Sequence, residues 1–203
     1  MEVIKNLVPE YKYNIKCPYS MKPEFYVVHN TANDAPAVNE IAYMISNNNE
    51  VSFHYAIDDK SIVQGIEENR NGWHASDGGS GEGNRKGIAI EICYSKSGGT
   101  KFNEAEKLTA KFIAKGLKEK GWGIDKVKKH QDFGNHKYCP HRTLDMGWQR
   151  FLNMIKVELD TLNNTKIKKL YRVQVGAFSV KSNAENLRKE LIAKGYNAFI
   201  KEE

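Results

Sequence analysis

Side chains that bind metal ions are concentrated near one end of the larger part of this sequence. Residues 130–141, HQDFGNHKYCPH, hold three histidines and Cys139 in a segment that contains Gly134 and Pro140. A structural zinc site normally uses four protein ligands in paired spacings, whereas a catalytic zinc uses three and leaves one position open. The paired spacings are missing here. The segment therefore favours a three-ligand catalytic site.

Two further candidates for chemistry lie in apolar runs upstream. His29 ends FYVVH and is followed by NTANDAP, a loop composition, so it lies where a strand meets a connecting segment. In IAIEIC, residues 88–93, the three isoleucines share one strand face, and Ala89, Glu91 and Cys93 share the other. A carboxylate among apolar residues needs a partner or a task. Glu91 either pairs with a lysine or exchanges protons with a metal-bound water and a leaving group, and the spacing leaves both open.

Strands and helices alternate around these residues. β-Branched and aromatic residues predict strands at 25–29, 51–57, 61–64 and 88–93. Apolar residues at helical spacing predict helices that begin at Pro36, at Asn103 with Glu106 as a capping-box partner, and near Trp148. This pattern predicts an α/β domain whose helices pack on a sheet.

The glycine-rich segment DGGSGEGN, residues 77–84, resembles a phosphate-binding loop only in its glycine content. It lacks the Lys-Ser/Thr ending of a P-loop and does not match G-x-G-x-x-G. We interpret it as a mobile surface loop beside a site rather than as a nucleotide-binding loop.

Charge is unevenly distributed along the chain. The formal net charge is +6, but residues 1–160 hold 22 basic and 21 acidic side chains, whereas residues 161–203 hold 9 and 4. The sequence predicts three parts: a domain at 1–160, a polar linker at 161–169 and a small unit at 170–203. In that unit, alternation predicts strands at 171–177 and 196–201, with a helix capped by Ser182 between them.

Five motifs in order resemble the type 2 N-acetylmuramoyl-L-alanine amidases, particularly the endolysins of phages and prophages of Gram-positive bacteria. The motifs are VVHN, SFHYAID, GWHASDG, IAIEI and, after His130, KYCPHR, and the resemblance covers about residues 25–148. It implies a mixed central sheet flanked by helices. It also implies a zinc-dependent hydrolase that cuts the amide between N-acetylmuramic acid and L-alanine in peptidoglycan.

The same resemblance implies roles for individual residues. His29, His130 and Cys139 match the zinc ligands, Glu91 the general base and acid, and Lys137 the lysine that stabilises the oxyanion. Residues expected around the site, in the substrate groove or behind the ligands, are His54, Trp73, His74 and His141. Some relatives have a catalytic tyrosine where Phe53 stands, and a phenyl ring cannot replace its hydrogen bond.

The C-terminal phrase YRVQVGAFSVKSNAENLRKEL resembles the first half of a SPOR domain, a module that binds peptidoglycan glycan strands. A single β-α-β unit buries too little surface to be stable alone. We therefore expect it to pack on the amidase, to be part of a longer module, or to form a homodimer, with slight preference for the homodimer.

A non-catalytic peptidoglycan-binding protein is the main alternative to an enzyme, because related recognition proteins replace the cysteine ligand. The presence of Cys139 and Glu91 favours the enzyme. Nucleic-acid binding is disfavoured, because the basic tail has no matching motif.

No apolar run is long enough to insert into a membrane or to serve as a signal peptide. We therefore expect synthesis in the cytoplasm and holin-type release to the wall.

Overall fold

The computed structural model describes residues 1–164 and 173–202. The chain divides into two compact units, Met1–Thr165 and Lys166–Glu203, and each is considered by itself. Within the described residues, no helix combines the length and the apolar character that crossing a membrane requires.

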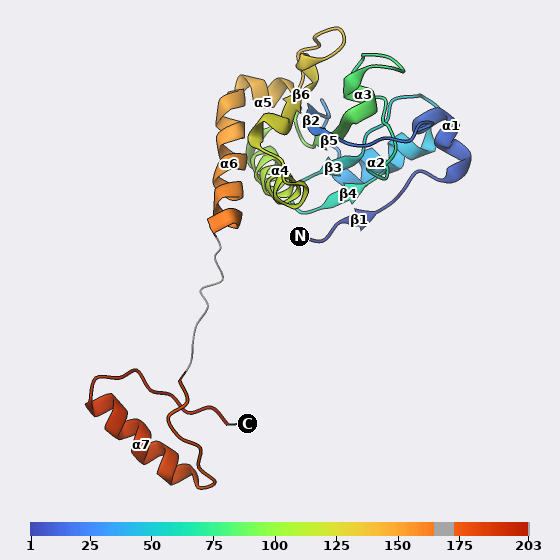
Figure 1. The fold of residues 1–203 in the computed structure, drawn as a ribbon. Helices are drawn as coiled ribbons and strands as arrows, with labels where there is room; N and C mark the ends of the chain where they lie inside the picture. The colour runs from blue at the N-terminus through green and yellow to red at the C-terminus, as the bar shows by residue number, and fades with distance from the viewer. Residues whose placement is uncertain (165–172, 203) are drawn as a thin grey trace. The chain divides into compact units, whose positions relative to one another are not determined.

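A mixed sheet forms the centre of the first unit, as the family resemblance implies, and it has six strands (Figure 1). The strand order is β1-β4-β3-β5-β2-β6. All neighbouring pairs are parallel except β3 with β4. The strands are β1 (Ile4–Lys5), β2 (Phe25–Asn30), β3 (Tyr55–Ile57), β4 (Ile62–Gln64), β5 (Gly87–Ile92) and β6 (Val127–Lys129).

The strand predicted at 51–57 is only partly formed, because β3 begins at Tyr55. The backbone N–H of Ser52 donates to the Trp73 carbonyl, and that of Phe53 donates to the Met44 sulfur. These residues therefore connect the sheet to neighbouring segments instead of extending the ladder.

Helix α4 (Gly99–Lys120) packs on one face of the sheet, and the second long helix, α6 (Trp148–Asn164), packs against α4 (Figure 1). Helix α4 begins four residues before the predicted Asn103, because Gly98 and Gly99 both adopt positive φ and allow the chain to turn into the helix earlier. Glu106 is not a capping residue: it is buried and its Oε2 lies 2.6 Å from Arg150 Nη2.

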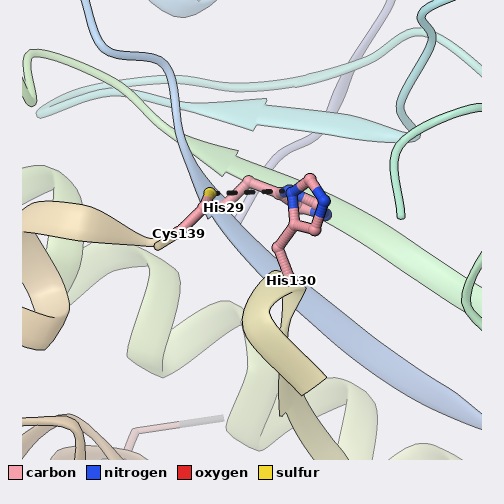
Figure 2. A group of neighbouring side chains, drawn as sticks. All are labelled: His29, His130 and Cys139. Atoms are coloured by element: carbon pink, nitrogen blue, oxygen red, sulfur yellow. Dashed lines mark hydrogen bonds between the residues drawn. The ribbon is translucent and has the colours of Figure 1, made fainter. Parts of the chain in front are cut away.

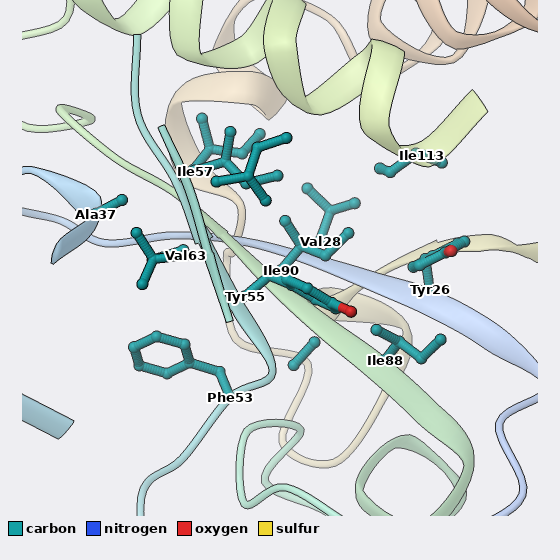
Figure 3. Packing of buried hydrophobic residues seen from close by; sticks show 14 of the residues in the cluster. Tyr26, Val28, Ala37, Phe53, Tyr55, Ile57, Val63, Ile88, Ile90 and Ile113 are labelled. Atoms are coloured by element: carbon teal, nitrogen blue, oxygen red, sulfur yellow. The ribbon is translucent and has the colours of Figure 1, made fainter. Parts of the chain in front are cut away.

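The isoleucines of β5 share one face, as the alternation predicts, and this face lies against α4. Ile88 and Ile90 are in register with Tyr26 and Val28 of β2, so all four side chains lie on one face (Figure 3). That face meets α4 closely, because a Cβ on Gly116 would lie 1.9 Å from Tyr26 Oη. All four side chains are fully or almost fully buried and belong to the main hydrophobic core.

Helix α2 (Ala37–Ser46) packs against β3 and β4 with buried Ala37, Ile41 and Met44. It begins directly after Pro36, as predicted. The rest of the unit consists of short elements, which connect these strands and helices and complete the domain: η1 (Glu10–Lys12), α1 (Tyr13–Lys16), α3 (Glu82–Lys86), η2 (Ile124–Lys126), η3 (His130–Asp132) and α5 (His141–Asp145).

Helix α6 continues to Asn164, so the first residues of the predicted linker are helical. In the second unit the predicted helix is present as α7 (Lys181–Ala193), which begins one residue before the expected cap Ser182, and Gly195 follows with φ of 84°.

The two strands predicted beside α7 are absent from residues 173–202. Residues 171 and 172 of the first predicted strand lie outside the described residues. Alternation fits a strand only when a partner strand receives its hydrogen bonds, and a single β-α-β unit offers few partners. Val173 and Tyr196, one from each predicted strand, are 85% and 65% exposed.

Candidate active site

Register across the sheet brings the first two site residues together. His29 of β2 is paired with Glu91 of β5, and Glu91 is paired with Ala56 of β3. On the other side of β2, Val28 is paired with Lys129, the last residue of β6, and His130 follows it directly. Paired residues of parallel strands point to the same face, so Glu91 and His29 lie side by side on the face opposite the isoleucines.

Small side chains keep this face open at β5. Gly87 and Ala89 precede Glu91 at the two-residue spacing, and Ala56 lies beside it on β3. The imidazoles of His54 and His74 occupy the space next to these residues, with both rings buried. A strand with large residues on both faces would leave no room for the site.

Cys139 is brought to the same place by the loop that follows η3. The backbone N–H of Gln131 donates to the Cys139 carbonyl at 3.0 Å, which closes the loop beside His130. His29 Nδ1 lies 3.1 Å from His130 Nδ1 and 3.8 Å from Cys139 Sγ (Figure 2). The three residues are buried, and their ligand-type atoms all lie within 4.8 Å of one another.

The protonation states of this cluster suit a metal ion. Burial, followed by the charges of His74, His130 and Lys137, lowers the pKa of His29 well below its usual value. Burial and Lys137 lower the pKa of His130 to about 4. Both imidazoles are therefore neutral at neutral pH, which is the form that binds metals. Burial, with a contribution from Glu91, raises the pKa of the Cys139 thiol to about 12, and a bound cation opposes this by favouring the thiolate.

The donor set fits zinc. Ligand atoms that share one tetrahedral zinc lie roughly 3.3–3.8 Å apart, because Zn–N and Zn–S bonds are about 2.0–2.3 Å long. The distances from His29 Nδ1 to His130 Nδ1 and to Cys139 Sγ are close to this range. Two nitrogens and one sulfur are ligands that zinc prefers.

Glu91 carries a carboxylate oxygen with no compensating contact. Its Oε2 is buried and has no hydrogen-bond partner among the described residues. Burial, followed by the charge of Glu40 on α2, raises the pKa of Glu91 to about 8, while Lys137 opposes the shift. Lys137 itself is exposed on the loop before Cys139. Glu91 therefore has the environment of a group that exchanges protons near neutral pH.

The remaining predicted site residues occupy different surroundings. His54 Nδ1 accepts from the Ala89 N–H at 3.0 Å, and its Nε2–H donates to the Arg70 carbonyl at 2.9 Å, so both ring nitrogens are engaged. His74 Nδ1 lies 3.1 Å from His29 Nε2, in direct contact with the cluster. His141 Nε2 lies 3.3 Å from the Ser95 carbonyl and contacts no member of the cluster in the described hydrogen bonds.

The Trp73 side chain is held by contacts within the protein. Its indole N–H donates to the Ile15 carbonyl at 3.0 Å, and its ring packs edge-on against Tyr19 with centroids 6.0 Å apart. The ring is half-buried. Its place in a substrate groove stays a prediction.

Sequence reasoning missed two residues near the cluster. Ser76 Oγ lies 3.2 Å from His130 Nε2, and the charge of Glu40 acts on Glu91. Ser76 lies two residues after His74, which is a weak signal. Glu40 is a half-buried residue in the first turn of α2, and no spacing rule relates it to β5.

A buried His, His, Cys cluster beside a glutamate is an arrangement suited to metal-assisted hydrolysis. Residues 19–142 match the family described as N-acetylmuramoyl-L-alanine amidase, and residues 168–203 match the SPOR domain. The chain belongs to the N-acetylmuramoyl-L-alanine amidase family and is therefore an amide hydrolase of peptidoglycan.

Relatives and solved structures agree with this assignment. N-acetylmuramoyl-L-alanine amidase CwlA of Bacillus subtilis (strain 168) is 52% identical over 200 residues, which cover 90% of this chain and 73% of CwlA. The amidase XlyB of the same organism is 56% identical over 78% of this chain, and the match spans only 50% of XlyB. The solved structure of PlyL is 50% identical with a TM-score of 0.73, and the match covers 76% of this chain and 97% of the solved chain.

Proposed function

We propose that this amidase holds one zinc ion through His29 Nδ1, His130 Nδ1 and Cys139 Sγ. With that ion it cleaves the amide between N-acetylmuramic acid and L-alanine. The observation that carries the proposal is the convergence of three buried ligand atoms within 4.8 Å, with Glu91 in register beside His29. Three protein ligands leave one coordination position open, as catalytic zinc sites require.

A zinc ion held there supplies Lewis acidity, which polarises the scissile carbonyl and lowers the pKa of a water molecule. The protein's own contribution is proton transfer at Glu91. Its unpaired Oε2 takes a proton from the attacking water as the new C–O bond forms. The same oxygen returns that proton to the L-alanine nitrogen as the C–N bond breaks, so the carboxylate is regenerated.

Lys137 supplies positive charge beside the reacting carbonyl. Its ammonium is close enough to influence the pKa of Glu91, His29 and Cys139, so its field extends over the cluster. An exposed loop position allows the side chain to approach the substrate oxygen where negative charge develops. Phe53 is buried and has no hydroxyl, so no tyrosine acts from that position.

The substrate is the bacterial cell wall. The second unit matches the SPOR domain, and the segment 161–203 carries 9 basic and 4 acidic side chains. This excess attracts an anionic wall weakly and in a salt-sensitive manner, in addition to any contact with glycan strands. Holin-type release is the route to the wall that the phage-type resemblance implies.

A homodimer through the second unit gives the exposed apolar residues of its tail a partner. Val173, Val175 and Val180 are more than half exposed. Pairing of two copies supplies the strands that one copy lacks. Analytical ultracentrifugation at micromolar concentration tests this, and a monomeric mass contradicts it.

Digestion of purified cell walls tests the proposed reaction. An amidase releases new amino groups without new reducing ends, and removal of zinc by a chelator abolishes the release until zinc is restored. New reducing ends alone would identify a glycosidase. Wall binding without either product would identify a non-catalytic binding protein.

A further inference from the structure

The segment from His74 to Asn84 contacts both histidines of the cluster. His74 Nδ1 lies 3.1 Å from His29 Nε2, and Ser76 Oγ lies 3.2 Å from His130 Nε2. In each ring, Nε2 is the nitrogen on the far side from Nδ1, which faces the cluster. Two side chains of one loop therefore contact the outer nitrogens of two ligands that are far apart in sequence.

Only one placement of the protons on the two imidazoles satisfies these contacts and leaves both Nδ1 atoms able to bind a metal ion. A neutral imidazole has one N–H and one lone pair. When Nε2 holds the proton, His29 donates to His74 Nδ1 and His130 donates to Ser76 Oγ. Both Nδ1 lone pairs then point towards each other and towards Cys139 Sγ. The other tautomers place a hydrogen between these atoms and block a metal ion.

The backbone of this segment is fixed by its own side chains. Asn84 Oδ1 accepts from the N–H groups of both His74 and Ala75 at 2.8 Å. The Asp77 carboxylate accepts from Gly83 N–H at 2.7 Å and from Asn84 N–H at 3.2 Å. The glycine-rich stretch is thus a pinned loop rather than the mobile loop expected from its composition.

Its glycines allow close packing beside the cluster. A Cβ on Gly83 would lie 2.4 Å from Ala75 Cβ. From the other side, a Cβ on Gly134, in the loop that carries Cys139, would lie 2.4 Å from the Ser76 carbonyl oxygen. The two loops therefore meet backbone to backbone, which brings Ser76, at φ of 57°, within reach of His130.

We propose that His74 and Ser76, held in place by Asp77 and Asn84, form an imidazole clamp that fixes the tautomer and orientation of His29 and His130. The four are positioning residues, and the DGGSGEGN segment contributes Asp77 and Asn84, which hold the backbone of the clamp. This inference rests on the proposed metal centre. Groups that hydrogen-bond the outer nitrogen of a ligating histidine typically contribute about 10–100-fold to metal affinity.

Zinc affinity of the full-length chain, measured by competition with a chromogenic chelator, tests the clamp. His74→Leu removes the acceptor and is expected to weaken zinc binding by about 10–100-fold, whereas His74→Asn keeps an acceptor near the Nδ1 position and restores most of it. Ser76→Ala weakens binding, and Ser80→Ala, at the exposed tip of the same loop, leaves it unchanged. Unchanged affinity in both His74→Leu and Ser76→Ala overturns the clamp.

Side-chain ¹H–¹⁵N NMR of the zinc-loaded wild type provides a second test that does not depend on any variant folding. The clamp predicts protonated Nε2 and metal-bound Nδ1 in both His29 and His130. Protonated Nδ1 in either residue overturns it. Failure of the wild type to bind zinc at all overturns the proposed function instead, so the two outcomes are distinguishable.

Discussion

The two faces of strand β5 differ in what they are built to do. On one face, Ile88, Ile90 and Ile92 are fully buried against the core below α4. On the other, Gly87, Ala89 and Glu91 leave space for imidazoles and place one carboxylate beside His29. Because successive side chains of this six-residue strand alternate between its faces, one face contributes to the stability of the core and the other carries the candidate site. Substitutions on the two faces should consequently change different measurements.

The largest expected effect comes from substituting Glu91, which lies on the face of β5 that carries the candidate site, here called the site face. Glu91→Gln keeps the shape of the side chain and removes proton exchange, so the rate of amide cleavage should fall by about 10²–10⁴-fold. Zinc content and the circular dichroism spectrum should be unchanged. Retention of more than a tenth of the wild-type rate on purified walls would show that Glu91 pairs structurally instead.

Ile90→Ala tests the opposite face. Ile90 is fully buried, so truncation leaves a cavity and should lower the free energy of unfolding by about 2–5 kcal/mol. Cleavage rate per folded molecule should not change. The matched control is Ile4→Ala, since Ile4 is 50% exposed and its loss should change stability far less. Equal effects of the two in urea denaturation would contradict the assignment of the core.

Ala89→Val adds volume on the site face, where there is no free space. Ala89 is fully buried and its N–H donates to His54, so overpacking should cost about 1–3 kcal/mol and displace the neighbouring imidazoles. Ala114→Val adds the same volume at a fully buried position of α4. Only Ala89→Val should lower the cleavage rate per folded molecule; an equal loss in both would remove the distinction between the faces.

A smaller effect concerns pH in the zinc-free protein. The folded pKa of Glu91 is about 8, above its ordinary value of 4.5, so the folded state binds more protons between these values. Stability from this group is therefore lost as pH rises, by at most about 1.4 kcal/mol per pH unit. The stability of Glu91→Gln relative to wild type should increase from pH 5.5 to 8 in urea titrations. A constant difference would mean that the pKa of the carboxyl is not raised.

Much of this site follows from local sequence rules. The two-residue period of a strand is enough to separate the isoleucines from Glu91. The position of His29 at a strand end is also confirmed, because β2 ends at the next residue, Asn30. Cys139 and His130 are close in sequence and remain close in space. Sequence patterns do not provide the register that pairs His29 with Glu91, because that register depends on two strands that are distant along the chain.

Those structural predictions that failed did so where long-range partners decide the outcome. Residues 51–53 have a strand pattern, but the backbone N–H of Ser52 donates to the Trp73 carbonyl and that of Phe53 donates to the Met44 sulfur. Residues 173–177 alternate as a strand should, yet within the described part of the second unit no neighbour pairs with them. The contact of Ser76 with His130 depends on a loop held by Asn84, which no spacing rule anticipates.

Bound zinc per chain, measured by mass spectrometry after dialysis, tests the central claim most directly. We expect one equivalent of zinc per chain in wild type and in Glu91→Gln. We expect almost none in Cys139→Ser, because only this variant loses a metal ligand. Digestion of walls by the same samples should occur with wild type alone. One full equivalent of zinc in Cys139→Ser would contradict the metal centre proposed for this face.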